Sequence, residues 1–145
     1  MVDARFSVDR TFVQESLAAN EDEYFAATGR ELALLWHAPG YLVSSDIIAA
    51  GAAMNYTYVG RDVEAKDWVS AADAGSAPGI YQSAADLVER VVAAKRPGSI
   101  VPILVGPGEG TRSDYLFQKL DLLVNELGRL GYDIVPVSVL IEHAR

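Results

Sequence analysis

The chain contains no cysteine, which excludes disulfides, thiolate nucleophiles and zinc sites with cysteine ligands. Histidine is almost as scarce. His37 and His143 are the only two, and no His-x-x-x-His or Glu-x-x-His ligand pair occurs. The sequence therefore predicts no metal site formed by this chain alone. A Gly-x-Ser-x-Gly elbow is also absent, which argues against a serine hydrolase.

Long apolar runs and clusters of basic residues are missing too. The longest apolar run, at 47–54, is much shorter than a membrane span, so no membrane partner is predicted. Residues 1–5 show no signal-peptide pattern, and we expect a cytoplasmic protein if the chain is complete. The 12 basic residues are scattered and the net charge is −8, which argues against a nucleic-acid partner.

Helical and strand patterns alternate along the chain. Helices are predicted at 9–28, from Ser44 or Ser45 to about 54, at 84–95, from Ser113 to Gly131, and as a short turn at 139–143. Strands are predicted at 32–36, 56–59, 100–105 and 134–137. Alternation of this kind indicates parallel pairing through right-handed crossovers. The length fits one domain, so residues 1–145 are predicted to form a single α/β domain with a mainly parallel sheet.

Two short segments contain candidate binding residues. His37, Pro39 and Tyr41 follow the first predicted strand, where parallel α/β folds place their sites. They indicate either a polar site or a rigid turn whose histidine is satisfied by the backbone. Asp67 and Trp68 are a carboxylate beside an indole, a pair suited to sugar hydroxyls and a pyranose face. The alternative is a helix cap beside a buried aromatic anchor.

A glycine-rich loop at 106–112 precedes the last long helix. Its backbone amides could receive a phosphate group at Gly106–Gly110. The loop lacks the Gly-Lys-Ser/Thr ending of a P-loop, so a loop without a ligand is the alternative.

The order of these motifs resembles the second half of a polysaccharide deacetylase (NodB-homology) domain, over about residues 13–140. The resemblance rests on Thr28-Gly29, the turn at 36–41, Asp67-Trp68, and the ending Gly131-Tyr132 through Ser138. It implies a fold like half of a deformed (β/α) barrel, and carbohydrate as a ligand. The family removes N- or O-acetyl groups from polysaccharides, using a divalent metal such as zinc held by one Asp and two His.

The departures from the family pattern remove its chemistry. The motifs with the base and the metal ligands belong before this segment and are absent. His37 stands at the family's arginine position, Leu104 at the position of its general-acid histidine, and the family's Tyr-Gly is inverted as Gly40-Tyr41. We therefore assign no catalytic residue. His37, Asp67 and Leu104 are degenerate catalytic positions, and Pro39, Tyr41, Asp67 and Trp68 are the substrate-binding candidates.

Two explanations fit these departures: a fragment of a longer protein, or a degenerate descendant. Losing the arginine and the histidine inside the covered half favours the descendant. The chain is expected to be inactive alone, without a cofactor of its own, and whether it belongs to an enzyme stays open. The alternative is a non-catalytic α/β module that assembles with itself or with a partner chain. In either case, a homo-oligomer or the missing N-terminal half is expected to cover the open sheet edges.

Overall fold

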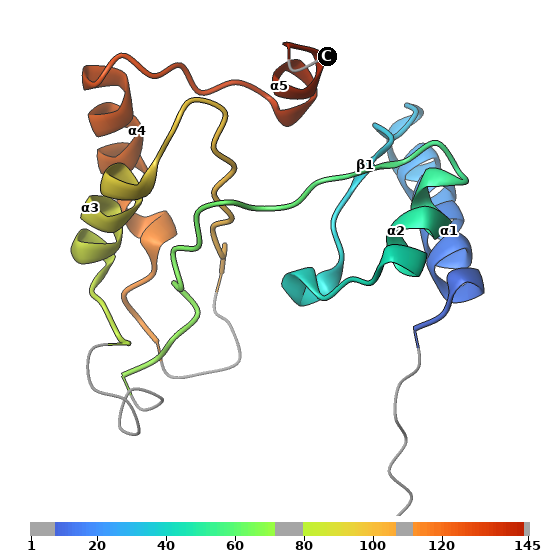
Figure 1. Ribbon diagram of the computed structural model, residues 1–145, viewed down its shortest axis with the longest axis horizontal. Helices are drawn as coiled ribbons and strands as arrows, with labels where there is room; N and C mark the ends of the chain where they lie inside the picture. Colours follow the sequence, from blue (N-terminus) through green and yellow to red (C-terminus); the bar gives the residue numbers. More distant parts are fainter. Residues whose placement is uncertain (1–7, 72–79, 107–111, 144–145) are drawn as a thin grey trace, which may run out of the picture. The chain divides into compact units, whose positions relative to one another are not determined.

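A computed structural model describes residues 8–71, 80–106 and 112–143 (Figure 1). The chain divides into two compact units, residues 1–60 and 61–145, and each is described by itself. The structure confirms a general α/β character, with mixed helices and a small parallel sheet. A single domain over the whole chain stays a prediction.

The first unit is built on two capped helices, both close to their predicted bounds. Helix α1 (Arg10–Thr28) begins where the Asp9 carboxylate accepts the Phe12 N–H at 2.8 Å. It ends at Gly29, whose φ of 67° is a left-handed conformation that glycine adopts without steric cost. Helix α2 (Ser45–Ala52) begins at the Ser44 cap.

A two-stranded sheet accompanies these helices. Strands β1 (Leu35–Trp36) and β2 (Thr57–Tyr58) pair in parallel, which confirms the predicted direction. Both are shorter than predicted: two residues of each strand pair, and the Thr57 and Val59 N–H groups donate to the carbonyls of Leu34 and Trp36. The core of this unit consists of five buried side chains, Val13, Leu17, Ile47, Ala50 and Tyr56.

The second unit packs helix α3 (Ala84–Ala94) against α4 (Leu120–Arg129). Ser83 and Asp86 form a capping box at the start of α3, as the Ser83 cap predicted. The core of this unit is the buried cluster of Val63, Ala65, Leu87, Val88, Val91, Leu116 and Leu123.

The prediction that Ser113 opens the last long helix is wrong. Helical structure begins with the 3-10 turn η3 (Leu116–Lys119), which continues into α4. The reason lies in Asp114, whose carboxylate accepts the Ala84 N–H at 2.8 Å. Its carbonyl accepts the Arg112 Nε–H at 2.8 Å, so the chain before η3 is tied to the start of α3.

The predicted strands at 100–105 and 134–137 are also wrong. Neither segment forms a ladder, and residue 137 begins α5 (Val137–His143). Pro102 and Pro136 lie inside these segments and have no N–H to donate to a neighbouring strand. The N–H groups of Ile100 and Leu104 donate to aspartate side chains instead. Within the described ranges, the sheet consists of β1 and β2.

Gly51 provides a test of packing in the first unit. A Cβ atom at this α2 position would lie 2.6 Å from Trp36 Nε1 and 2.8 Å from Trp36 Cε2. We expect Gly51→Ala to lower the free energy of unfolding by about 1–2 kcal/mol, because overpacking outweighs the better helix propensity of alanine. Urea unfolding followed by Trp36 fluorescence, in a Trp68→Phe background, measures the change.

Gly128→Ala in α4 is the matched control. No atom lies within 4 Å of its added Cβ, so helix propensity alone predicts a gain of about 0.5–1 kcal/mol. A Gly51→Ala protein at least as stable as the parent would contradict the packing described here.

Candidate functional site

Asp67 and Leu104 are brought together by the fold of the second unit. Asp67 is 4% exposed, and its Oδ2 accepts the Leu104 backbone N–H at 2.8 Å. The sequence grouped these positions as degenerate catalytic ones, and the structure joins them through a carboxylate and a backbone amide. Leu104 contributes an N–H here, and its aliphatic side chain has no proton to transfer.

The environment of Asp67 favours its neutral form. Burial raises the pKa of the Asp67 carboxyl above its ordinary value of 3.8, although the Leu104 N–H and the Arg112 charge act in the opposite direction. One of its oxygens is occupied by the Leu104 amide. In this chain, Asp67 therefore positions the segment at 100–105.

Asp62 makes a similar but more exposed contact with the same segment. Its carboxylate accepts the Ile100 N–H at 2.7 Å and the Ser99 hydroxyl at 2.8 Å. Its own N–H donates to the Ile100 carbonyl at 3.3 Å. Desolvation opposes ionisation of the carboxyl group, but the hydrogen bonds that the carboxylate accepts, including those from Ser99 and Ile100, outweigh it and lower the pKa of Asp62. Asp62 and Asp67 thus hold the two ends of this segment with carboxylates of different pKa.

Asp67 and Trp68 are the two central residues of a sharp turn, and their side chains differ in exposure. Lys66 adopts a φ of 58°, and the Val69 N–H donates to the Lys66 carbonyl at 3.2 Å. Asp67 is directed inward with Val69, while Trp68 remains 60% exposed. The exposed indole is the part of this pair that is accessible to a ligand.

Arg112 is a buried residue whose importance the sequence did not indicate. It is 6% exposed and donates to the carbonyls of Val69 at 2.7 Å and Gln82 at 2.8 Å. Its guanidinium carbon lies 4.9 Å from the Tyr81 ring centroid. The acceptors lie 43 and 30 residues away in sequence, so no local pattern could have predicted them.

The remaining candidates lie in the first unit. Pro39 and Tyr41 belong to the 3-10 turn η1 (Pro39–Tyr41), and the His37 ring stacks on Tyr41 with 5.0 Å between centroids. His37 Nδ1 lies 3.2 Å from the Ala38 carbonyl oxygen. Gly40 and Tyr41 both have positive φ, at 62° and 59°. The substrate-binding candidates therefore form two local groups, one in each unit.

The donor set does not fit the metal that the family resemblance implies. Among the described residues, no group of three or more His, Asp or Glu side chains could hold an ion. Asp67 already accepts a backbone N–H, and His143 lies in the last turn of α5.

The proposed anion loop at 106–110 lies outside the described residues except for Gly106. No helix in the described ranges is long and apolar enough to cross a membrane.

The sequence matches no family model and no curated protein. The deacetylase resemblance therefore stays a prediction, and function is argued from the geometry of these residues.

The raised pKa of Asp67 makes its effect on stability depend on pH. A carboxyl whose folded pKa exceeds its unfolded value stabilises the fold less as pH rises through the interval between them. Asp67→Asn removes this titration and keeps an oxygen acceptor for Leu104. We expect its free energy of unfolding to increase relative to the parent as pH rises above 3.8. Urea unfolding monitored by circular dichroism between about pH 2.5 and pH 7 measures the change for this variant and for its control.

Asp62→Asn is the control of opposite sign. Because the folded pKa of Asp62 is lowered, its carboxylate stabilises the fold above pH 3.8 and loses that effect as pH falls through the folded value. Asp62→Asn should therefore lose stability relative to the parent as pH rises toward 3.8. The same sign of pH dependence in both variants would contradict the assigned environments.

Proposed function

We propose that the chain is the second half of a polysaccharide-deacetylase-like domain that binds carbohydrate without hydrolysing it. The supporting observation is the turn at 66–69, which buries the Asp67 carboxylate and leaves the Trp68 indole 60% exposed. An exposed aromatic face packs favourably on the C–H groups of a pyranose ring. The half-barrel architecture belongs to the same proposal, with α3 and α4 as two of its outer helices.

The absence of hydrolysis follows from the chemistry of the residues at the family's positions. Asp67 is bound to the Leu104 amide, and the Leu104 side chain cannot act as an acid. His37 stacks on Tyr41 in the other unit, beside a backbone carbonyl. These residues offer neither a base beside an activated water nor a proton donor for a leaving group.

Calorimetry with an N-acetylated chito-oligosaccharide tests this proposal. We expect saturable binding that weakens about tenfold in Trp68→Ala, because removing the ring removes about 1.4 kcal/mol of stacking. Phe25→Ala is the matched control, since Phe25 on α1 is 59% exposed and should leave binding unchanged. Acetate release with added zinc should stay at background, and turnover abolished by a chelator would contradict the proposal.

A second function is favoured by the unpaired segments of the second unit. Residues 100–105 form no ladder, and Val105 at the end of this segment is 79% exposed. Exposed apolar backbone without a neighbouring strand is a surface on which another polypeptide can pair. The alternative is therefore an α/β module that assembles with itself or with a partner chain.

Light scattering over a range of protein concentrations distinguishes this alternative. Self-assembly predicts a mass that rises above 15.6 kDa and returns to the monomer value in Val105→Lys. Lysine at an exposed edge opposes strand addition without disturbing the buried core. A parent protein that remains monomeric at every concentration would rule out self-assembly.

A further inference from the structure

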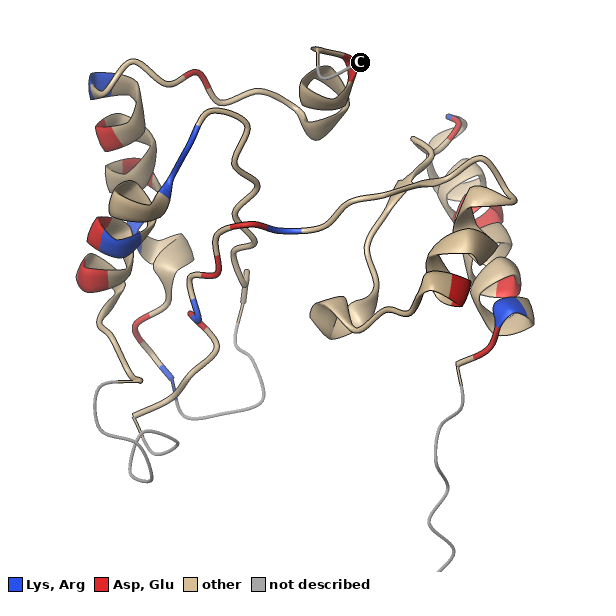
Figure 2. Ribbon diagram, viewed as in Figure 1, with Lys and Arg blue, Asp and Glu red and all other residues tan. Residues whose placement is uncertain are grey.

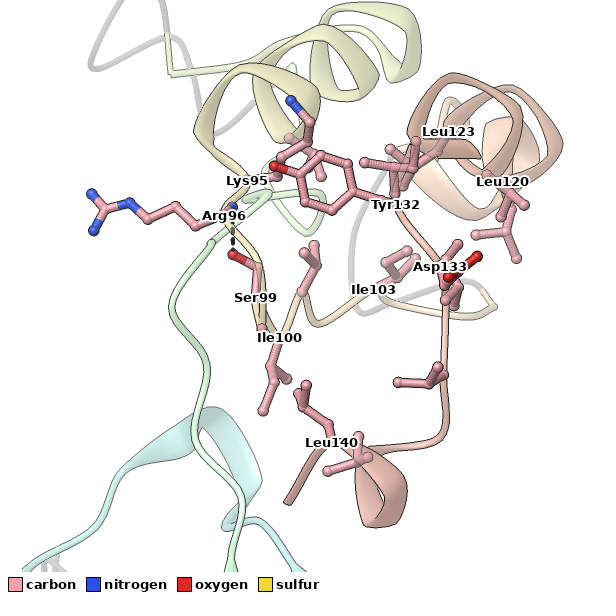
Figure 3. A pocket seen from close by; sticks show the side chains of 18 residues that line it. Lys95, Arg96, Ser99, Ile100, Ile103, Leu120, Leu123, Tyr132, Asp133 and Leu140 are labelled. Carbon is pink, nitrogen blue, oxygen red and sulfur yellow. Dashed lines mark hydrogen bonds between the residues drawn. The ribbon is translucent and has the colours of Figure 1, made fainter. Parts of the chain in front are cut away.

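The second unit contains an apolar pocket that its own side chains leave open. The pocket has a volume of about 410 Å³, within the usual range for sites that bind small organic molecules. Figure 3 shows its lining, contributed by α3, the 98–103 segment, α4 and the chain from 132 to α5. The apolar lining includes Val91, Ile100, Ile103, Leu123, Val124 and Leu140.

The pocket continues the hydrophobic core and opens to solvent at one side. Val91 and Leu123 on its wall are buried, at 0% and 3% exposed. Val124 and Ile134 remain 41% and 61% exposed. An apolar ligand that covered these side chains would remove their surface from water, at roughly 25 cal/mol per Å².

Two basic residues contribute to the lining of this pocket. Lys95 and Arg96 follow α3 directly, in a chain whose net charge is −8 (Figure 2). Lys95 Nζ donates to the Val92 carbonyl at 2.7 Å and lies 5.2 Å from the Tyr132 ring centroid. These contacts hold the ammonium beside Tyr132, and the Val92 bond uses one of its three N–H donors.

The other charges around the pocket are arranged asymmetrically. Figure 3 shows the Arg96 guanidinium extending away from the cavity, whereas the Lys95 ammonium lies against the ring of Tyr132, which lines the pocket. Among the residues that the structure describes, Asp133 is the one acidic side chain that lines the pocket. An anionic group near Lys95, followed by a hydrocarbon chain, matches this distribution of charge and apolar surface.

We propose that the pocket binds a linear fatty carboxylate, with its hydrocarbon chain among the apolar side chains and its carboxylate near Lys95. The site does not depend on carbohydrate binding at Trp68. No covalent step is involved, and the ligand class is defined by an apolar tail and a single negative head group.

Calorimetry of the full chain with octanoate, decanoate and dodecanoate at low salt tests the proposal. We expect saturable binding at one site, tightening about fourfold for each added methylene. Lys95→Gln should weaken dodecanoate binding about threefold and leave dodecanol binding unchanged. Lys119→Gln is the matched control, because this exposed lysine of η3 does not line the pocket.

Ile134→Glu tests the apolar part, since a carboxylate at this exposed position should repel the ligand while the fold tolerates it. Circular dichroism confirms that each variant is folded, and loss of dodecanoate binding supports the proposal. Absence of saturable binding up to about 1 mM dodecanoate would overturn it. So would equal affinity for dodecanoate and dodecanol, or a stable dimer in which the Ile134 surface is covered.

Discussion

The second unit depends on carboxylates that replace the backbone ladder of a sheet. Asp62 and Asp67 accept the N–H groups of Ile100 and Leu104, which a parallel strand would otherwise bind. A buried N–H without an acceptor costs about 1–3 kcal/mol, and the part-buried Leu104 N–H needs the Asp67 carboxylate for this reason. Between these two ends, Val101 and Ile103 pack against the core, so the segment joins the core without forming a strand.

This arrangement determines which surfaces of the unit are accessible. Asp67 is directed inward to reach Leu104, and the turn that directs it places Trp68 outside. Residues of the 100–103 and 132–135 segments line the apolar pocket without pairing as strands, and Val124 of α4, which also lines it, remains 41% exposed. The proposed carbohydrate surface and the proposed fatty-carboxylate pocket therefore share one cause, a segment at 100–105 that is held by carboxylates and does not pair as a strand.

The sequence predicted the local features of the fold and missed those that depend on distant residues. The predicted helix starts at 9, at Ser44 or Ser45 and after Ser83 agree with the structure, because each N-cap bonds within three residues of itself. The strand patterns at 100–105 and 134–137 failed, because a strand requires a partner that local apolarity does not provide. Pro102 and Pro136 lie inside these two patterns, and they were evidence in the sequence against paired strands.

The candidate site was predicted in part. Asp67-Trp68 is the most informative pair, although the buried member is the carboxylate and the exposed one is the indole. Every second residue from 63 to 69 is buried, which is the period of an extended chain. The apolar residues Val63, Ala65 and Val69 show this alternation in the sequence, and it could have placed Asp67 on the buried side. The rigid turn at His37 was one of two alternatives, and the stacking on Tyr41 favours it.

Nuclear magnetic resonance of the Leu104 amide tests the Asp67 interaction most directly. We expect the chemical shift of this amide proton to titrate with a midpoint above pH 3.8, and Asp67→Asn to abolish the titration. A Leu104 amide that does not respond to pH, or a midpoint below 3.8, would contradict it.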